Sequence, residues 1–167
     1  MNNQHEPLTG ILAGQLAPDF SLLNTNNIPV SLSDFTGQKN VLLLFFPKAF
    51  TNTCTRELCS VRDDISRYEN ADTQVIAISV DPTSTQADYK KDQQLNYELL
   101  SDADKQVSIL YNSIYYSPDD KALPTVSKRS AFLIDKQGII QYSEILEDAY
   151  QIPDFTAINN ILLRLSK

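Results

Sequence analysis

The clearest signal along the chain is a continuous apolar run at residues 41–46, which Pro47 ends. A run of this length predicts a strand that is buried on both faces of a parallel or mixed sheet, and it is far too short to cross a bilayer as a helix. Shorter apolar runs within residues 19–35 are separated by asparagines and Pro29. They predict a small hairpin ahead of that strand, at the edge of the sheet.

Beyond Pro47 the apolar positions change to helical spacing. From Thr55 onward they recur three and four residues apart, which predicts a helix that begins beside Cys54 and ends near Asn70. The apolar face of this helix is formed by Leu58, Val61, Ile65 and Tyr68. The end of the buried strand, a proline-bearing loop and the start of a helix are therefore expected to meet at Cys54.

The next part of the chain alternates between strands and helices. We expect a strand at residues 74–80, a polar helix at 83–95, a short strand at 97–100 and a helix at 103–111. Residues 112–130 contain Pro118, Pro124 and many polar side chains, and they predict a long loop.

The last part of the chain predicts a hairpin and a helix. Apolar segments at 131–135 and 139–143 flank a turn that ends in Gly138. A closing helix follows Pro153, with an apolar side formed by Phe155, Ile158, Leu162 and Leu165. The whole order predicts an α/β fold, a central mixed β-sheet flanked by helices on both faces. The 167 residues, 42% of them hydrophobic, fit a single domain over residues 1–167.

Charge narrows the set of partners. The chain has 14 basic and 21 acidic residues and a formal net charge of −7, which argues against nucleic acid or an anionic membrane as a partner. The first fifteen residues contain no Lys, no Arg and no continuous apolar run, so we expect neither a signal peptide nor a transit peptide. The simplest expectation is a cytoplasmic protein.

The chain contains two cysteines, Cys54 and Cys59. In a reducing compartment such a pair is more often catalytic or redox-active than structural. A structural zinc site needs four Cys or His ligands, and the only further candidate is His5, which we expect to be an exposed residue of the terminus. We therefore expect no metal and no cofactor.

The surroundings of Cys54 are suited to hold a thiol as its anion. The exposed amides and the dipole at a helix N-terminus favour a thiolate over a thiol. Thr51, Thr53 and Thr55 add hydroxyls, of which one can cap the helix and another can donate a hydrogen bond to a thiolate or to an oxygen of its substrate. Pro47 restricts the loop and has no amide hydrogen. These residues predict a nucleophilic thiolate.

The segment Pro47-Lys48-Ala49-Phe50-Thr51-Asn52-Thr53-Cys54 matches the pattern P-x-x-x-T-x-x-C, and with it the sequence resembles the peroxiredoxins. Further segments are similar in order and spacing: Ala17-Pro18-Asp19-Phe20, Ser79-Val80-Asp81, Leu99-Leu100-Ser101-Asp102 and Arg129-Ser130-Ala131-Phe132-Leu133-Ile134-Asp135. The resemblance implies a thioredoxin-like fold. It also implies that Cys54 is the peroxidatic cysteine, that Thr51 and Arg129 bind the peroxide, and that Pro47 shapes the pocket.

Two charged residues have both a simple and a functional interpretation. Arg129 by itself reads as a solvated charge at the start of a strand, whereas an arginine close to Cys54 would stabilise the thiolate and orient a peroxide. Glu57 lies three residues after Cys54, where a carboxylate complements the helix dipole. The resemblance adds that Glu57 could pair with a site arginine.

The spacing of the second cysteine points to a subgroup. Cys59 follows Cys54 by five residues, and this segment resembles the peroxiredoxin Q group (bacterioferritin comigratory proteins), in which Cys59 would be the resolving cysteine. Asn52 and Thr53 depart from the usual Pro-Gly, and residues 47–51 are equally similar to one-cysteine peroxiredoxins of the alkyl hydroperoxide reductase E type. The resemblance implies hydrogen peroxide and organic hydroperoxides as substrates, with thioredoxin or glutaredoxin as the reductant.

Helix geometry restricts how Cys59 can act. Residues five apart on an ideal helix have Cα atoms about 8.6 Å apart, whereas a disulfide tolerates less than about 7 Å. A bond between Cys54 and Cys59 therefore requires the first turns of the helix to unwind. If Cys59 is instead only a small buried hydrophobic residue, the chain is a one-cysteine enzyme.

Two other functions compete with the peroxidase. A thioredoxin-like thiol-disulfide reductase normally carries Cys-x-x-Cys, and the four residues between Cys54 and Cys59 argue against it. A binding or holdase module would leave the combination of Pro47, Thr51, Cys54 and Arg129 unexplained. The sequence allows a monomer or a homodimer, and Tyr115 and Tyr116 either mark a dimer contact or cover the core.

Overall fold

The computed structural model describes residues 11–166, so the prediction for His5 lies outside the described residues. Its main sheet has seven strands in the order β2-β1-β5-β4-β3-β8-β9. These strands are β1 (Ser21–Asn24), β2 (Pro29–Ser31), β3 (Asn40–Phe45), β4 (Thr73–Ser79), β5 (Glu98–Ser101), β8 (Ser130–Ile134) and β9 (Ile140–Ile145). A separate hairpin is formed by β6 (Ile114–Tyr116) and β7 (Pro124–Ser127).

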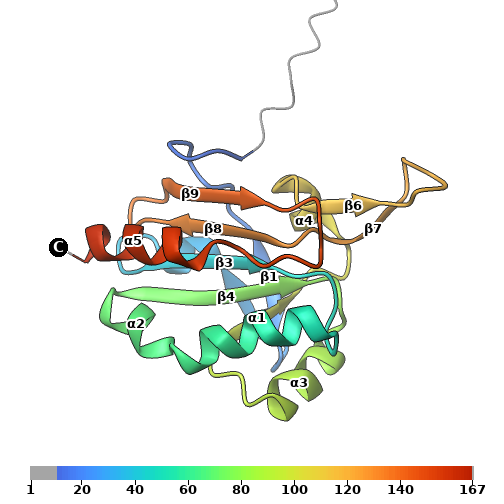
Figure 1. Cartoon of the computed structure of the whole chain (residues 1–167), viewed down its shortest axis with the longest axis horizontal. Coiled ribbons are helices and arrows are strands. Elements are labelled where there is room, and N and C mark those ends of the chain that lie inside the picture. Colours follow the sequence, from blue (N-terminus) through green and yellow to red (C-terminus); the bar gives the residue numbers. More distant parts are fainter. Residues whose placement is uncertain (1–10, 167) are drawn as a thin grey trace, which may run out of the picture.

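The helices are α1 (Asn52–Asp63), α2 (Ile65–Asn70), α3 (Thr83–Asp92), α4 (Gln106–Leu110) and α5 (Phe155–Leu165), with a short 3-10 turn at Leu32–Asp34. None of these helices is long and apolar enough to span a membrane. In Figure 1, α1 and α5 cross in front of the sheet, and the β6–β7 hairpin extends beyond its end.

The sheet is mixed, as predicted. β3 runs parallel to β4 and antiparallel to β8, and β4 runs parallel to β5. All six residues of β3 are buried, because the strand lies near the centre of the sheet with a core on each face, and five of the six are apolar. The predicted hairpins are also present: β1 pairs with β2 at one edge, and β8 pairs with β9 at the other.

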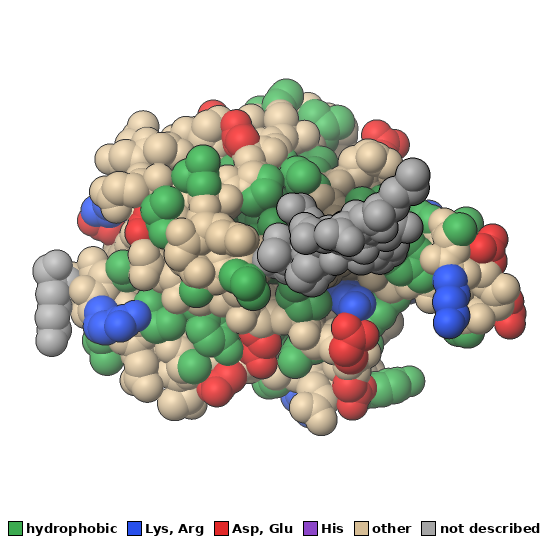
Figure 2. Space-filling model, turned by 90° about the horizontal axis from the view of Figure 1, so that it is seen from above, with side chains coloured by type: hydrophobic (Ala, Val, Ile, Leu, Met, Phe, Trp, Pro, Cys, Tyr) green, Lys and Arg blue, Asp and Glu red, His purple; other side chains and the backbone are tan. Residues whose placement is uncertain are grey.

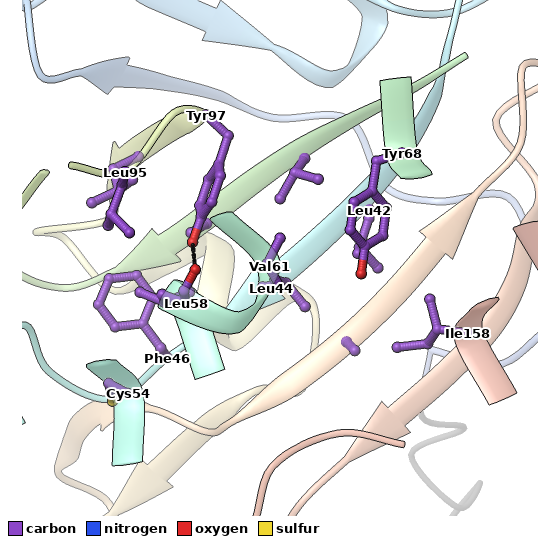
Figure 3. Close-up of a cluster of buried hydrophobic side chains, with 14 of the residues drawn as sticks. Leu42, Leu44, Phe46, Cys54, Leu58, Val61, Tyr68, Leu95, Tyr97 and Ile158 are labelled. Atoms are coloured by element: carbon purple, nitrogen blue, oxygen red, sulfur yellow. Dashed lines mark hydrogen bonds between the residues drawn. The ribbon is translucent and has the colours of Figure 1, made fainter. Parts of the chain in front are cut away.

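Successive residues of β3 point to opposite faces of the sheet. Leu42 and Leu44 contribute to a core that α1, α2, α3 and α5 cover, and Figure 3 shows part of this core. Leu43 and Phe45 contribute to a second core, which α4 and the segment around Phe20 cover. Helices therefore flank both faces of the sheet, and the predicted fold class is confirmed.

The predicted helix from Cys54 to Asn70 is wrong in one respect, because it is two helices. Asp64 separates α1 from α2, with φ −113° and ψ 20°, and Arg67 donates to its carboxylate at 2.6 Å. The apolar spacing continues across the break because Val61 and Tyr68 are both buried in the same core. Periodicity reports which side faces the core, but it does not report whether the backbone is continuous.

The predicted loop at residues 112–130 is also wrong, because it contains the β6–β7 hairpin. Pro124 is tolerated because it is the first residue of its strand. The Thr125 hydroxyl donates to the Tyr115 carbonyl at 2.9 Å, and the Ser127 hydroxyl bonds with that of Ser108 at 2.7 Å. Polar side chains thus stabilise a hairpin that the apolar pattern does not reveal.

The two tyrosines of this hairpin differ in environment. The Tyr115 hydroxyl donates to the carbonyl of Leu146 at 2.9 Å, and its ring is partly buried. Tyr116 is exposed. Tyr115 therefore covers the end of β9, while a dimer contact at these residues stays a prediction.

The helix predicted at residues 103–111 is shorter than expected. Lys105 has a left-handed backbone, with φ +65°, and so α4 begins only at Gln106. The Asp102 carboxylate accepts hydrogen bonds from the amides of Val107 and Ser108 at 3.2 and 2.7 Å. This buried side chain therefore satisfies the free amides at the start of α4.

Candidate active site

Cys54 lies at the junction that the sequence predicts, but the helix begins earlier than expected, at Asn52. It is the third residue of α1, where it belongs to the first turn, and its side chain is buried. Thr51 occupies the position before the helix, and its carbonyl accepts the first helical hydrogen bond, from the Thr55 amide at 3.0 Å. The amides of a first helical turn have no partner within the helix, and they favour an anion at this place.

Arg129 is far from Cys54 in the sequence, one residue before β8, but its side chain contacts Cys54. Its Nη2 donates to Cys54 Sγ at 3.2 Å. Its Nη1 donates to Glu57 Oε2 at 2.7 Å, and its Nε donates to the Ala149 carbonyl at 3.0 Å. The side chain is only 2% exposed. Three hydrogen bonds thus fix the guanidinium against the sulfur.

Glu57 is paired with Arg129 and is not a simple dipole complement. Its side chain is fully buried, and burial raises its pKa to about 7, against the Arg129 guanidinium, which favours the carboxylate. Glu144 adds a smaller effect in the direction of burial. Only Oε2 meets the arginine, because Glu57 Oε1 has no hydrogen-bond partner among the described residues. One oxygen of this buried carboxylate therefore lacks a hydrogen bond from residues 11–166. A buried ion pair of this kind stabilises the fold little, and its main effect is to orient the guanidinium.

A pocket of about 290 Å³ opens beside the sulfur. It is lined by Pro47, Thr51, Asn52, Thr53, Cys54, Arg129, Ala149 and Tyr150. The predicted site residues Pro47, Thr51, Cys54 and Arg129 are therefore brought together, although Arg129 is far from the others in the sequence. A cavity of about 520 Å³ between β1, β5 and α4 is larger, but neither cysteine nor arginine lines it.

Sequence reasoning missed the contribution of residues 149 and 150. The Ala149 carbonyl holds Arg129, and the Tyr150 side chain, which is 83% exposed, stands at the rim of the pocket. Both residues lie in an irregular segment between β9 and α5. A backbone carbonyl leaves no trace in residue identity, so only the three-dimensional structure could find this contact.

The threonines act differently from the prediction. Thr51 has the position of a helix cap, but its side chain accepts no bond from the helix. Its hydroxyl donates instead to the Lys48 carbonyl, at 2.8 Å. The Thr55 hydroxyl bonds with that of Tyr89 at 2.9 Å, which ties α1 to α3. The expected hydroxyl cap is therefore absent at the start of α1.

The loop that leads into α1 contains a backbone with unusual geometry. Phe50 has φ +66°, in the left-handed region that side chains disfavour. Its ring is 53% exposed and packs on the ring of Tyr89, with centroids 4.9 Å apart. One residue earlier, the Ala49 amide donates to the Asp81 carboxylate at 2.8 Å. Contacts with α3 and with the Asp81 side chain, which follows β4, thus maintain the loop in one conformation.

Cys59 lies on a different side of α1 from Cys54. Its side chain is partly buried, and its thiol donates to Gln93 Oε1 at 3.5 Å. Both cysteines are free thiols. Between them, the Leu58 carbonyl accepts a hydrogen bond from the Tyr97 hydroxyl at 2.7 Å, as Figure 3 shows. The helix is continuous from Asn52 to Asp63, so the separation expected for an ideal helix applies.

Surface charge and metal ligands add little to this site. Across residues 11–166, no group of three or more His, Cys, Asp or Glu side chains could hold a metal ion. On the face that Figure 2 shows, the Lys and Arg side chains stand apart from one another. The polar groups of the residues that line the pocket include the Cys54 thiol, the Arg129 guanidinium and the Thr51 hydroxyl.

Known proteins are similar to this chain over most of its length. Residues 13–143 match the model of the AhpC/TSA family. Peroxiredoxin Bcp of Escherichia coli K12 is 41% identical over 130 residues, which are 78% of this chain and 83% of the relative. Alkyl hydroperoxide reductase E of Mycobacterium tuberculosis is 36% identical over 132 residues, which are 79% of this chain and 84% of the relative.

Solved structures show the same fold. The peroxidoxin BcpB of Mycobacterium tuberculosis superposes with a TM-score of 0.79 at 26% identity, covering 93% of this chain and 96% of that one. The reduced 2-Cys peroxiredoxin of Plasmodium vivax superposes with the same TM-score at 28% identity, covering 90% and 80%. The matched residues and the identity over most of both chains establish that this protein belongs to the AhpC/TSA family and is a peroxiredoxin, a thiol-dependent peroxidase.

Proposed function

We propose that Cys54 is the peroxidatic cysteine and that it reduces hydrogen peroxide and organic hydroperoxides. The thiolate sulfur attacks one peroxide oxygen, the O–O bond breaks, and Cys54 becomes a sulfenic acid. The other oxygen leaves as water or an alcohol after it takes up the proton that the thiol had lost. The observation that carries this proposal is the contact between Arg129 Nη2 and Cys54 Sγ at 3.2 Å, in a pocket that Thr51 also lines.

Each pocket residue has a role in this step. Arg129 stabilises the thiolate and then the negative charge that develops on the peroxide oxygens. Glu57 and the Ala149 carbonyl hold the guanidinium in place, which avoids reorganisation during the reaction. Thr51 binds the peroxide, and Pro47 forms the wall of the pocket without presenting an amide hydrogen.

Cys59 is the resolving cysteine in this proposal. Its thiol displaces water from the Cys54 sulfenic acid and forms a disulfide. Because both residues lie in α1, the helix must first unwind between them, and this breaks the Thr55–Tyr89 and Tyr97–Leu58 hydrogen bonds. Thioredoxin then supplies the two electrons that reduce the disulfide. A cytoplasmic location, expected from the sequence, is compatible with this cycle.

Two other functions are alternatives to this two-cysteine peroxidase cycle. In a one-cysteine peroxidase an external thiol, from thioredoxin or glutaredoxin, would reduce the Cys54 sulfenic acid directly. This alternative is favoured by the likeness to alkyl hydroperoxide reductase E and by the contact of Cys59 with Gln93 rather than with the pocket. A thiol-disulfide reductase would need a second sulfur at the start of α1, where only Cys54 lies.

The test is mass spectrometry of the reduced protein after one equivalent of hydrogen peroxide. We expect a disulfide between Cys54 and Cys59 in the native chain and a persistent Cys54 sulfenic acid in Cys59→Ser. Cys54→Ser should not consume peroxide at all, and retained turnover in that variant would refute the proposed function. A stable sulfenic acid with free Cys59 in the native chain would instead select the one-cysteine cycle.

A further inference from the structure

One peptide group of the active-site loop is bonded at both ends. The group between Lys48 and Ala49 donates its N–H to Asp81 Oδ2 at 2.8 Å. Its carbonyl accepts the hydroxyl of Thr51, also at 2.8 Å. Because a peptide group is planar and rigid, it connects the carboxylate on one side to the hydroxyl on the other. Asp81 therefore reaches Thr51 without touching the pocket.

Asp81 is held firmly behind the loop. It is only 8% exposed, and the Ser79 hydroxyl donates to the same Oδ2 at 2.8 Å. The Asp81 carbonyl accepts the hydroxyl of Ser101 at 2.6 Å. The side-chain amide of Gln86 donates to the Ser79 hydroxyl at 2.9 Å and to the Leu100 carbonyl at 2.8 Å. A buried polar network at the ends of β4 and β5 thus fixes the position of the carboxylate.

The direction of the Thr51 hydroxyl follows from its partner. A carbonyl oxygen can only accept, so the single hydroxyl proton of Thr51 points toward Lys48. Thr51 therefore offers only lone pairs to the pocket, whereas the Arg129 guanidinium offers only N–H donors. A hydroperoxide placed between them donates its O–H to Thr51 and accepts from Arg129. The two residues together fix which way the peroxide lies.

An anion that accepts from the N–H of a peptide group polarises it and makes its carbonyl a better acceptor. From this geometry we infer that Asp81 is a positioning residue, which acts through the peptide group between Lys48 and Ala49 to hold the Thr51 hydroxyl as an acceptor for the peroxide O–H. This role deepens the proposed peroxidase function and rests on it. The Asp81 side chain does not line the pocket and so does not contact the substrate directly.

The experiment is a double-mutant cycle on the second-order rate constant for the reaction of Cys54 with hydrogen peroxide. Asp81→Ala removes the acceptor, and we expect a loss of about tenfold. Asp81→Asn retains a weaker, uncharged acceptor, and a loss of about threefold is expected. In a Thr51→Val background both losses should disappear, because no hydroxyl is left to position.

Alkylation of Cys54 by iodoacetamide is the readout that separates positioning from general damage, because this reagent does not use the Thr51 hydroxyl. Because Asp81 acts through the Thr51 hydroxyl, we expect Cys54 to be alkylated in Asp81→Ala and Asp81→Asn within about twofold of the native rate. If Asp81→Ala does not fold, the isosteric Asp81→Asn carries the cycle alone.

Two results would overturn the inference. One is a loss at Asp81 that persists in full when Thr51 is valine, and the other is an equal slowing of alkylation and peroxide reduction. A failure of the proposed function looks different, since the native chain would then form no Cys54 sulfenic acid. If the native chain reduces peroxide normally but the losses from the Asp81 and Thr51 substitutions are additive, the result contradicts the role of Asp81 and leaves the proposed function intact.

Discussion

Replacing Tyr97 with Phe tests whether α1 must open before Cys59 can reach Cys54. Tyr97 is buried, and its hydroxyl donates to the Leu58 carbonyl at 2.7 Å. Leu58 directly precedes Cys59, so this bond holds the part of α1 that must unwind. Phenylalanine leaves the ring in the core and removes only the hydroxyl. The substitution therefore weakens the closed helix without creating a cavity.

The size of the effect follows from one hydrogen bond. Its net contribution is about 1 kcal/mol, and since about 1.4 kcal/mol is a factor of ten, the open form of α1 should be populated about fivefold more. If opening precedes disulfide formation, the disulfide should form about fivefold faster. Formation of the sulfenic acid should not change, because Tyr97 does not line the pocket.

The assay mixes reduced protein with one equivalent of hydrogen peroxide and stops the reaction at intervals with an alkylating reagent. Mass spectrometry then gives the amounts of sulfenic acid and disulfide at each time. Tyr111→Phe is the matched control, because that hydroxyl also donates to a backbone carbonyl, of Pro18, on the other face of the sheet. Equal disulfide rates in Tyr97→Phe and the native chain would refute the reasoning that closure of α1 limits resolution.

Three further substitutions test other contacts of the structure. Arg129→Lys loses the planar contacts with Cys54, Glu57 and Ala149, and kcat/KM for hydrogen peroxide should fall about 100-fold; an unchanged value would remove Arg129 from the mechanism. Burial raises the pKa of Glu57 from 4.5 to about 7, so its contribution to stability is complete below pH 4.5 and is lost as the pH rises to about 7. Urea unfolding should therefore show the stability of the native chain, relative to Glu57→Gln, falling as the pH rises over this range, and parallel pH profiles would contradict it. Asp154→Ala removes the carboxylate that accepts from the Ala157 amide at the start of α5, which should cost about 1 kcal/mol in thermal unfolding without changing peroxidase activity.

The sequence predicted the sheet better than it predicted the details of the helices. The apolar run that became β3 and the turn at Gly138 have direct physical signatures, because burial on two faces and a positive φ each select particular residues. The break at Asp64 and the late start of α4 have weaker signatures. They depend on one or two backbone angles that many residue types tolerate.

The site could be predicted only in part. Cys54, Thr51 and Pro47 are close in the sequence, so local patterns suffice to group them. Arg129 was connected with them through the resemblance to the peroxiredoxins, because no periodicity reports which strand end meets which helix start. The contacts of Tyr97 with Leu58 and of Asp81 with Ala49 involve backbone atoms, which every residue type carries alike. Such contacts can be found only when the chain is folded.

The left-handed backbone of Phe50 has a consequence for engineering this enzyme. A non-glycine residue in this conformation costs about 1 kcal/mol or more. The contact of the Phe50 ring with Tyr89 offsets this cost. A search for heat-resistant variants would favour Phe50→Gly, because glycine has no such penalty. The same change would loosen the turn that leads to Thr51. Thermal robustness and catalytic order are thus competing objectives at this single position.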